Sequence, residues 1–322
     1  IPLGELSFNL LTGINGIRKF RGSVMLAEGS IGLQSPTKVL PILGPYPYLF
    51  QEYRLRYITR IDFDKIRPQL NRNIDLLKPN VWVCRSSSAL RTFLDRSYSL
   101  ERTLVFDIET FMGMPTCISF CFDGIESVCI PFMDQSIDID NRVLMIDLIA
   151  RILASPIKKV NQNIKYDWKR LEAWGFSVTN VVGDTMLAAS TLYCEFPKNL
   201  GFLTSIYTDL PYFKDEGREF DPDKHKKEQF YLYNAKDSAV DCEVDEAQEV
   251  DLLALADRYN VPLKEYYYDY MMKKHKFYLK LQMTGKRVDH DRQKELMKKY
   301  TAMQHEVHKK LVDAIGDEIN VK

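Results

Sequence analysis

Blocks of apolar and polar positions along the chain predict an α/β protein. Between residues 79 and 255, short apolar runs alternate with longer stretches in which apolar residues recur every three or four positions. Short runs bounded by turn residues are typical of strands, and a 3.6-residue period is typical of helices. The expected strands span residues 81–84, 103–108, 116–122 and 127–132, with short runs at 159–160 and 178–182, and the expected helices span residues 88–95, 141–154, 165–174 and 184–192. This order predicts a mixed sheet with flanking helices.

The N-terminal region has a different pattern. Residues 10–48 hold much of the Gly and Pro and two short apolar runs, which favours strands and loops over long helices. Residues 62–77 place charged residues around apolar ones, and Lys78-Pro79-Asn80 ends this pattern. We therefore expect a small α/β domain over residues 1–78.

The C-terminal third predicts mostly helix. Residues 208–228 are polar and predict a mobile loop, which is followed by a long helix from about residue 228 to residue 259. Helical patterns continue after Pro262 and over residues 290–315. We therefore expect a central α/β domain over residues 79–255 and a helical tail over residues 256–322.

Length and charge narrow the class of protein. The 322 residues are 45% hydrophobic, enough for about two domains with sizeable cores. The 44 Lys and Arg balance the 44 Asp and Glu, so a polyanion would have to meet local basic patches. Neither a long apolar run nor a basic leader is present, which predicts no membrane span and a cytoplasmic protein at the nucleoid or replication site. Because the chain starts at Ile1 and not at Met, we expect a fragment of a longer protein.

The cysteine and histidine positions argue against disulfides and zinc. The six cysteines form no C-x-x-C pair and lie among apolar neighbours, which predicts reduced thiols in the core. All five histidines lie at or after His225, so residues 1–224 contain neither a histidine triad nor a histidine metal site.

Two carboxylates at the end of an apolar strand are the sharpest local feature. Asp107 and Glu109 lie two positions apart, so their side chains point to the same face of the strand. Two acids on one face repel each other unless a cation lies between them, which makes the pair a candidate site for a divalent metal. The alternative is an ordinary exposed strand end.

Two further acids lie at predicted helix starts. Asp167 follows Asn161-Gln-Asn-Ile-Lys-Tyr and is either a third ligand or an acid that the helix dipole favours in a first turn. Asp184 precedes an apolar helical run, and we expect it to cap that helix at its N-terminus.

The long predicted helix supplies a phenol and another acid. Tyr233 and Asp237 are four residues apart and lie on one helix face. Asp241 and Asp245 continue the same row, which is also typical of an ordinary solvated face. The last ligand therefore stays open between Asp237 and Asp241.

These segments, taken together, resemble a known family. Asp107-Ile-Glu-Thr, Asn161-Gln-Asn-Ile-Lys-Tyr-Asp, Asp184-Thr-Met-Leu-Ala and Tyr233-Asn-Ala-Lys-Asp resemble the motifs of the proofreading 3′→5′ exonuclease domain of family A DNA polymerases. That domain is the tyrosine subtype of the DEDD superfamily, and the resemblance extends over about residues 81–255. It implies a ribonuclease H-like mixed sheet and a two-metal 3′→5′ exodeoxyribonuclease.

The resemblance also implies roles for individual residues. The residues that would hold two Mg²⁺ or Mn²⁺ ions are Asp107, Glu109, Asp167 and Asp237. Tyr233 would help to position the attacking water. The residues that match positions near the single-stranded 3′ end of DNA are Thr110, Gln162, Asn163 and Tyr166.

General chemistry agrees with this assignment. Phosphodiester hydrolysis needs an activated water and a stabilised leaving oxygen, and two metals about 3.5–4 Å apart supply both. Carboxylates suit Mg²⁺ or Mn²⁺. A phenol with a pKa of about 10 is a weak base, so orientation of water is the better role for Tyr233. The terminal base must leave its partner, so the substrate is a frayed end. Phe111, Met112 and Met114 either pack against unstacked bases or fold onto their own core.

The N-terminal region carries a second resemblance. Residues 11–24 and 39–45 are similar to the C-terminal half of a uracil-DNA glycosylase-like domain. Gly44 occupies the place of that family's histidine, so we expect a degenerate domain with a structural or DNA-guiding role. Arg18, Lys19 and Arg21 form either a phosphate contact or, more simply, a solvated basic loop.

The tail resembles the start of a polymerase domain. Residues 282–289 match the segment that leads into the thumb, whereas the palm and fingers are not present in this sequence. We therefore expect the chain to act as a proofreading exonuclease whose partner is the remainder of a polymerase chain. The alternatives are an exoribonuclease that trims RNA and a catalytically silent DNA-binding scaffold.

Overall fold

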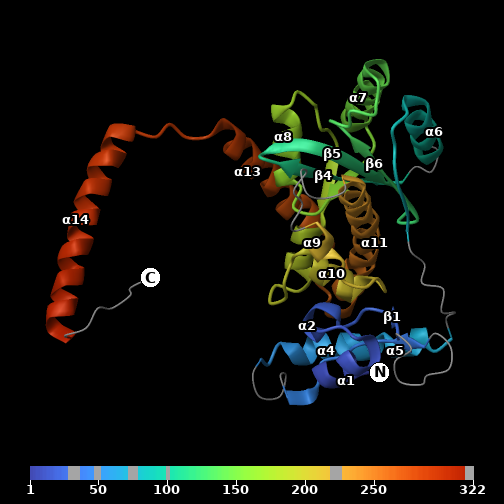
Figure 1. The fold of residues 1–322 in the computed structure, drawn as a ribbon, viewed down its shortest axis with the longest axis horizontal. Coiled ribbons are helices and arrows are strands. Elements are labelled where there is room, and N and C mark those ends of the chain that lie inside the picture. The colour runs from blue at the N-terminus through green and yellow to red at the C-terminus, as the bar shows by residue number, and fades with distance from the viewer. Residues whose placement is uncertain (28–36, 47–51, 72–78, 99–101, 218–226, 316–322) are drawn as a thin grey trace. The chain divides into compact units, whose positions relative to one another are not determined.

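The chain forms two compact units, Ile1–Lys276 and Phe277–Lys322. The computed structural model, drawn in Figure 1, describes residues 1–27, 37–46, 52–71, 79–98, 102–217 and 227–315. The domain boundaries expected after residues 78 and 255 both fall inside the first unit and stay predictions.

A six-stranded mixed sheet forms the centre of the first unit, as the sequence predicts. Its strands are β3 (Asn80–Val83), β4 (Leu104–Phe111), β5 (Met114–Cys121), β6 (Glu126–Pro131), β7 (Lys159–Asn161) and β8 (Val181–Asp184). The spatial order is β3-β6-β5-β4-β7-β8. Strands β4, β5 and β6 pair antiparallel, whereas β3 runs parallel to β6, and β7 and β8 run parallel to β4.

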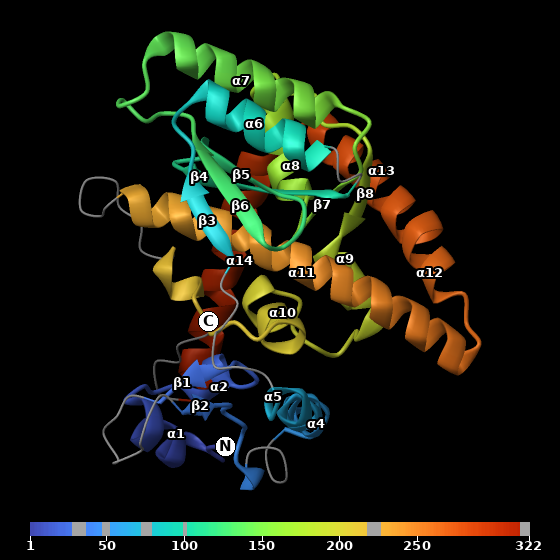
Figure 2. The same ribbon diagram turned by 90° about the vertical axis from the view of Figure 1, so that its right-hand side faces the viewer.

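Helices cover both faces of this sheet (Figure 2). One face carries α6 (Ser87–Tyr98), α7 (Ile139–Ala154) and α8 (Lys165–Ala173), and the other carries α11 (Lys227–Tyr259). The main apolar core lies between the sheet and the first three helices. The expected fold class, a mixed sheet with flanking helices, is confirmed.

Two features of this region differ from the sequence prediction or go beyond it. Helix α10 (Leu200–Tyr207) was not expected. Six of its eight residues are buried, so no polar face reveals the helical period. The expected loop contains a 3₁₀ turn at Lys214–Glu216, and its residues 218–226 lie outside the described residues.

Helix α9 (Thr185–Leu192) begins as expected, because Asp184 accepts hydrogen bonds from the backbone N–H groups of Met186 and Leu187.

The N-terminal segment is a small α/β assembly. It contains α1 (Glu5–Thr12), α2 (Ile17–Phe20), β1 (Met25–Leu26), β2 (Lys38–Val39), α4 (Leu55–Asp64) and α5 (Ile66–Gln69). The expectation that Arg21 belongs to a solvated or phosphate-binding loop is wrong. Its guanidinium is buried and makes two 2.7 Å bonds to the carboxylate of Asp62 and a 3.2 Å bond to Ser205 of α10. A fully buried carboxylate needs this partner, so Arg21 joins the N-terminal segment to α10.

The tail is helical, as expected. It contains α12 (Leu263–Glu265), a π-helical turn at Tyr266–Met271, α13 (Met272–Thr284) and α14 (His290–Ile315). No helix in the described part of the chain combines the length and the apolar character that a membrane span needs. All six cysteines are free, and the core expectation is wrong only for Cys194, which is exposed beyond the end of α9.

Candidate active site

Strand β4 places two acids on one face. Val105, Asp107 and Glu109 share that face, while Phe106 and Ile108 are buried on the other. A bulge follows Glu109, where Thr110 pairs with Pro115 of β5. Proline has no N–H for the ladder, so the regular pairing is broken there and the strand bends just beyond the two acids.

Helix α11 brings a third acid, Asp237, to the pair of Asp107 and Glu109. Its small residues Ala235 and Ser238 are buried against the sheet, and Ser119 of β5 donates a 2.9 Å hydrogen bond to the carbonyl of Asn234. The amide of Asn234 donates a 2.8 Å hydrogen bond to Asp107 Oδ2.

The result is a compact group of carboxylates. Oxygens of Asp107, Glu109 and Asp237 lie within 4.8 Å of one another, and we call these three residues the acidic cluster. Asp237 is the member that comes from α11. The two strand acids are therefore not an ordinary exposed strand end.

Asp167 approaches the acidic cluster from helix α8. It is buried in the first turn of the helix, and its Oδ1 accepts a 3.0 Å hydrogen bond from the backbone N–H of Ile108, the residue between Asp107 and Glu109. Burial and the charges of these two neighbours raise the pKa of Asp167 well above its usual value. The acids from all three predicted motifs therefore meet at one place.

The electrostatics of the acidic cluster fit a cation. Burial and the charge of Asp237 raise the pKa of Asp107 to about 8, and burial with the two aspartates raises that of Glu109 well above its usual value. Asp237 Oδ1 is buried and has no hydrogen-bond partner within the described residues. An unpaired buried carboxylate oxygen beside two more carboxylates is a ligand set for a hard divalent cation.

A lysine that no sequence pattern singles out lies against the acidic cluster. Lys214 Nζ is 2.6 Å from Asp237 Oδ2. Its positive charge lowers the pKa of Asp107, Glu109 and Asp237 and so opposes the effect of burial on these acids. Lys214 lies in the polar segment expected to be a loop, where no periodicity marks one charge among many.

Tyr233 is packed beside the acidic cluster, one helical turn before Asp237. Its ring contacts that of Phe213, with 5.9 Å between centroids. Burial, and next the charge of Asp237, raise the pKa of the phenol, so Tyr233 stays protonated and is no general base. A Cβ at Gly217 would lie 2.4 Å from Tyr233 Cε1, so only glycine fits against the ring there.

Asp241, the other acid left open, is bonded elsewhere. Thr185 Oγ1 lies 2.6 Å from Asp241 Oδ1 and also 2.6 Å from Gln162 Oε1. The hydroxyl has one proton, so it donates to only one of these oxygens, and a protonated Asp241 supplies the other proton. Burial raises the pKa of Asp241 well above its usual value, which agrees with a neutral acid. Of the two candidates, the structure groups Asp237 with the strand acids.

Two of the four residues expected to contact DNA adjoin acids of the site in sequence, Thr110 next to Glu109 and Tyr166 next to Asp167. Thr110 Oγ1 and the hydroxyl of Tyr166 are 2.7 Å apart, and the Arg170 guanidinium covers the exposed Tyr166 ring at 3.3 Å. Gln162 donates to the carbonyl of Lys198, and Asn163 adopts a left-handed backbone with a φ of 56°.

The hairpin beyond the bulge is open to solvent. Phe111, Met112 and Met114 are 38%, 88% and 49% exposed. These three side chains therefore do not pack into the core of their own domain, which was one of the two alternatives.

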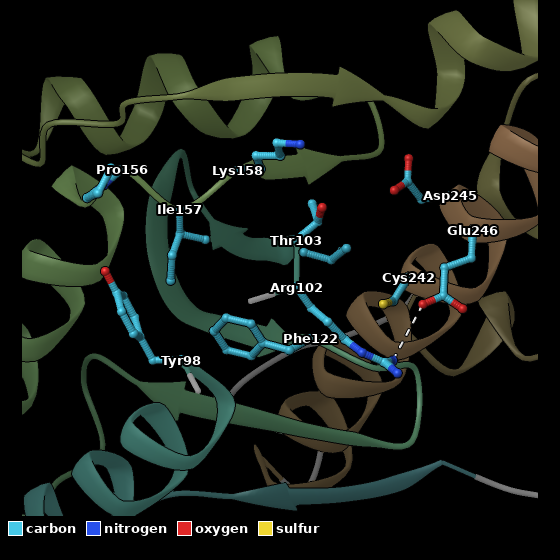
Figure 3. A pocket seen from close by; sticks show the side chains of 11 residues that line it. Tyr98, Arg102, Thr103, Phe122, Pro156, Ile157, Lys158, Cys242, Asp245 and Glu246 are labelled. Atoms are coloured by element: carbon cyan, nitrogen blue, oxygen red, sulfur yellow. Dashed lines mark ion pairs between the residues drawn. The ribbon is translucent and has the colours of Figure 1, made fainter. Parts of the chain in front are cut away.

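A separate cavity of about 540 Å³ lies near the start of β4 (Figure 3). Its lining includes Tyr98, Phe122 and Lys158, together with Arg102, which lies 3.7 Å from Glu246. None of the acidic cluster lines it, so the candidate chemistry belongs at the other end of the strand.

Comparison with known proteins reveals a shared fold. No protein-family model and no curated protein matches the chain. The POL domain of Pol1 from M. smegmatis, solved with DNA primer-template and dNTP, matches 74% of this chain and 38% of that chain, at 15% identity and a TM-score of 0.54. Escherichia coli RNase D, an exoribonuclease, matches 54% of this chain and 46% of its own chain, at 19% identity and a TM-score of 0.42. The catalytic core of RRP6 from Trypanosoma brucei matches 67% of this chain and 63% of its own chain, at 13% identity and a TM-score of 0.40. The chain thus spans about two fifths of the Pol1 structure, and what the two have in common is the fold.

Proposed function

We propose that the chain is a two-metal-ion 3′→5′ exonuclease that removes nucleotides from frayed DNA 3′ ends. The observation that carries this proposal is the acidic cluster of Asp107, Glu109 and Asp237, with Asp167 bonded to the strand between the first two. The fold shared with the Pol1 structure supports the same proposal.

The four acids would hold two divalent cations, Mg²⁺ or Mn²⁺. Such a pair of ions supplies an activated water and stabilises the leaving 3′-oxygen. Asp107 is oriented for this by Asn234, and Asp167 by the backbone of Ile108. Hydrogen bonds of this kind fix ligand geometry before a metal binds.

Tyr233 would orient the attacking water. Its phenol stays protonated beside Asp237, so it is a hydrogen-bond donor at neutral pH and not a proton acceptor. Thr110 and Tyr166 would contact the terminal nucleotide from the rim of the site, with Gln162 and Asn163 behind them. The hairpin side chains Phe111, Met112 and Met114, which are exposed, would stack on unpaired bases.

The remainder of a family A DNA polymerase would be the partner of this chain. The shared fold covers less than half of the Pol1 structure, which leaves most of that structure without a counterpart here. In this proposal residues 1–78 brace or guide DNA and do not excise bases, and residues 256–322 lead into the polymerase domain.

The test is digestion of 5′-labelled DNA with a mismatched 3′ end beside RNA of the same sequence, with Mg²⁺ or Mn²⁺. We expect a DNA ladder that shortens from the 3′ end, and loss of cleavage in Asp107→Asn. The matched control is Asp147→Asn, which makes the same change in a surface ion pair with Arg151 on α7 and is expected to cleave as wild type does. Degradation of RNA alone would assign an exoribonuclease, and DNA binding without cleavage would assign a scaffold. Either result overturns the proposal.

A further inference from the structure

Asp184 uses both its side chain and its main chain to join three segments of the first unit. The side chain is fully buried and is no part of the acidic cluster. Its oxygens accept hydrogen bonds from the N–H groups of Met186 and Leu187, which begin α9, and from those of Asn163 and Ile164, each at 3.1 Å. The second pair of bonds goes beyond the capping role expected from the sequence.

The turn held by these bonds leads directly to a proposed ligand. Asn163 and Ile164 immediately precede α8, whose first turn carries Asp167. Asn163 has a positive φ of 56°, a left-handed backbone that asparagine accepts more readily than most non-glycine residues. Asp167 in turn accepts from Ile108, so a chain of hydrogen bonds runs from Asp184 to the strand that carries two members of the acidic cluster.

The main chain of Asp184 is fixed by a tyrosine of the tail. The hydroxyl of Tyr267 accepts a 2.8 Å hydrogen bond from the N–H of Asp184 and donates a 3.1 Å hydrogen bond to its carbonyl. Tyr267 is fully buried on the π-helical turn, and burial raises its pKa well above the usual value, so the donor proton stays in place. Turns of this type are frequent at functional sites.

The neighbouring residues are shaped for this contact. A Cβ at Gly183 would lie 3.3 Å from the Tyr267 hydroxyl and 2.9 Å from Val160, so the absence of a side chain lets the phenol reach the strand. His275, on α13, adds a second contact from the tail, with its Nε2 3.4 Å from Asp184 Oδ2. Burial lowers the pKa of His275 to about 4, so the ring is neutral.

From these contacts we infer that Tyr267 is a positioning residue for the exonuclease site: through Asp184 it holds the turn that presents Asp167 to the metals. This inference rests on the proposed function. The tail segment that carries Tyr267 lies 100 residues beyond Asp167 in sequence and touches no member of the acidic cluster among the contacts described, so its influence on the site runs through the hydrogen-bonded turn. Residues that hydrogen-bond directly to metal ligands typically change metal affinity or activity about 10–100-fold when they are lost. Tyr267 acts through Asp184 and a turn, so we expect the lower end of that range.

The test compares Tyr267→Phe with Tyr268→Phe in the full chain. Each variant loses one phenol hydroxyl, but the Tyr268 hydroxyl bonds only to Glu249 among the described contacts and not to Asp184. We expect Tyr267→Phe to speed hydrogen exchange at the amides of Asn163 and Ile164 and to weaken Mn²⁺ binding, measured by electron paramagnetic resonance, about tenfold. Tyr268→Phe should leave both unchanged.

Two results would overturn the inference. One is equal behaviour of the two variants in exchange and in Mn²⁺ binding. The other is a lower melting temperature for Tyr267→Phe with both measurements unchanged, which would make the residue structural only. Should Tyr267→Phe not fold, Gly183→Ala replaces it in the same assays, because the added Cβ would lie 3.3 Å from the Tyr267 hydroxyl and displace it from the Asp184 backbone. A wild-type chain that binds no Mn²⁺ would refute the proposed function, and the exchange comparison alone would then decide the positioning role.

Discussion

Replacement of Lys214 by methionine tests whether the acidic cluster depends on a cation built into the chain. The ammonium group lies 2.6 Å from Asp237, and the two side chains are 22% and 5% exposed. Loss of one partner of a buried pair leaves the other uncompensated and costs about 3–5 kcal/mol. Because Lys214 keeps some contact with water, we take the lower end, about 3 kcal/mol, for the metal-free protein.

This magnitude predicts two opposite changes. In EDTA, the melting temperature should fall by about 6–12 °C, since 1 kcal/mol corresponds to about 2–4 °C in a domain of this size. Mn²⁺ binding should become tighter, because Lys214 and the metal use the same carboxylate and the variant removes the competitor. A change of about 3 kcal/mol is about a hundredfold in affinity, which sets the ceiling, and we expect at least about tenfold by electron paramagnetic resonance.

The control is Lys310→Met, which removes the same charge from a lysine that pairs with Glu306 on α14 at 2.6 Å. This control should change the melting temperature in EDTA and the Mn²⁺ affinity by no more than a small fraction of the changes expected for Lys214→Met. A fall in melting temperature together with unchanged or weaker Mn²⁺ binding in Lys214→Met would show that lysine and metal do not share a carboxylate, and the reasoning would fail.

Three more substitutions give directional results. Asp241→Asn should raise the melting temperature at pH 8, and the difference from wild type should shrink toward pH 4. The pKa of Asp241 is raised in the folded chain, so the carboxyl group stabilises the fold at low pH, and this stabilisation is lost as the pH rises through that pKa. Arg21→Met should cost about 3–5 kcal/mol in urea unfolding, because it leaves Asp62 buried without a partner. Gly217→Ala should slow cleavage up to about 100-fold with DNA binding retained, because the new methyl group displaces Tyr233; cleavage at the wild-type rate would contradict this.

Local periodicity explains what the sequence could predict. The two-residue period of β4 places Asp107 and Glu109 on one face whatever the rest of the chain does. The long 3.6-residue pattern of α7 likewise survives packing, because this helix keeps a polar face. Helix α10 was missed for the opposite reason, since a short helix that is buried on nearly all sides has no polar face to reveal its period.

Partners distant in sequence explain what could not be predicted. Arg21 meets Asp62 and Ser205 only after the chain has folded, and nothing near it in the sequence marks it as buried. Lys214 and Asn234 are ordinary polar residues until their positions against the acids are known. A pattern of side chains can assign an acid to a face, but the group that neutralises the acid depends on which segment folds over that face.

Contacts between distant segments also stabilise the buried carboxylates of the site before a metal binds. Burying several carboxylates together is strongly unfavourable unless each finds donors. Here Asn234 donates to Asp107, the backbone of Ile108 donates to Asp167, and Lys214 neutralises Asp237. Three of the four acids are thus held in place by the protein itself, while one oxygen of Asp237 stays unpaired and ready for a ligand. Metal binding at such a site exchanges one counter-ion for another and needs no refolding, so divalent cations should stabilise the chain while its secondary structure stays the same.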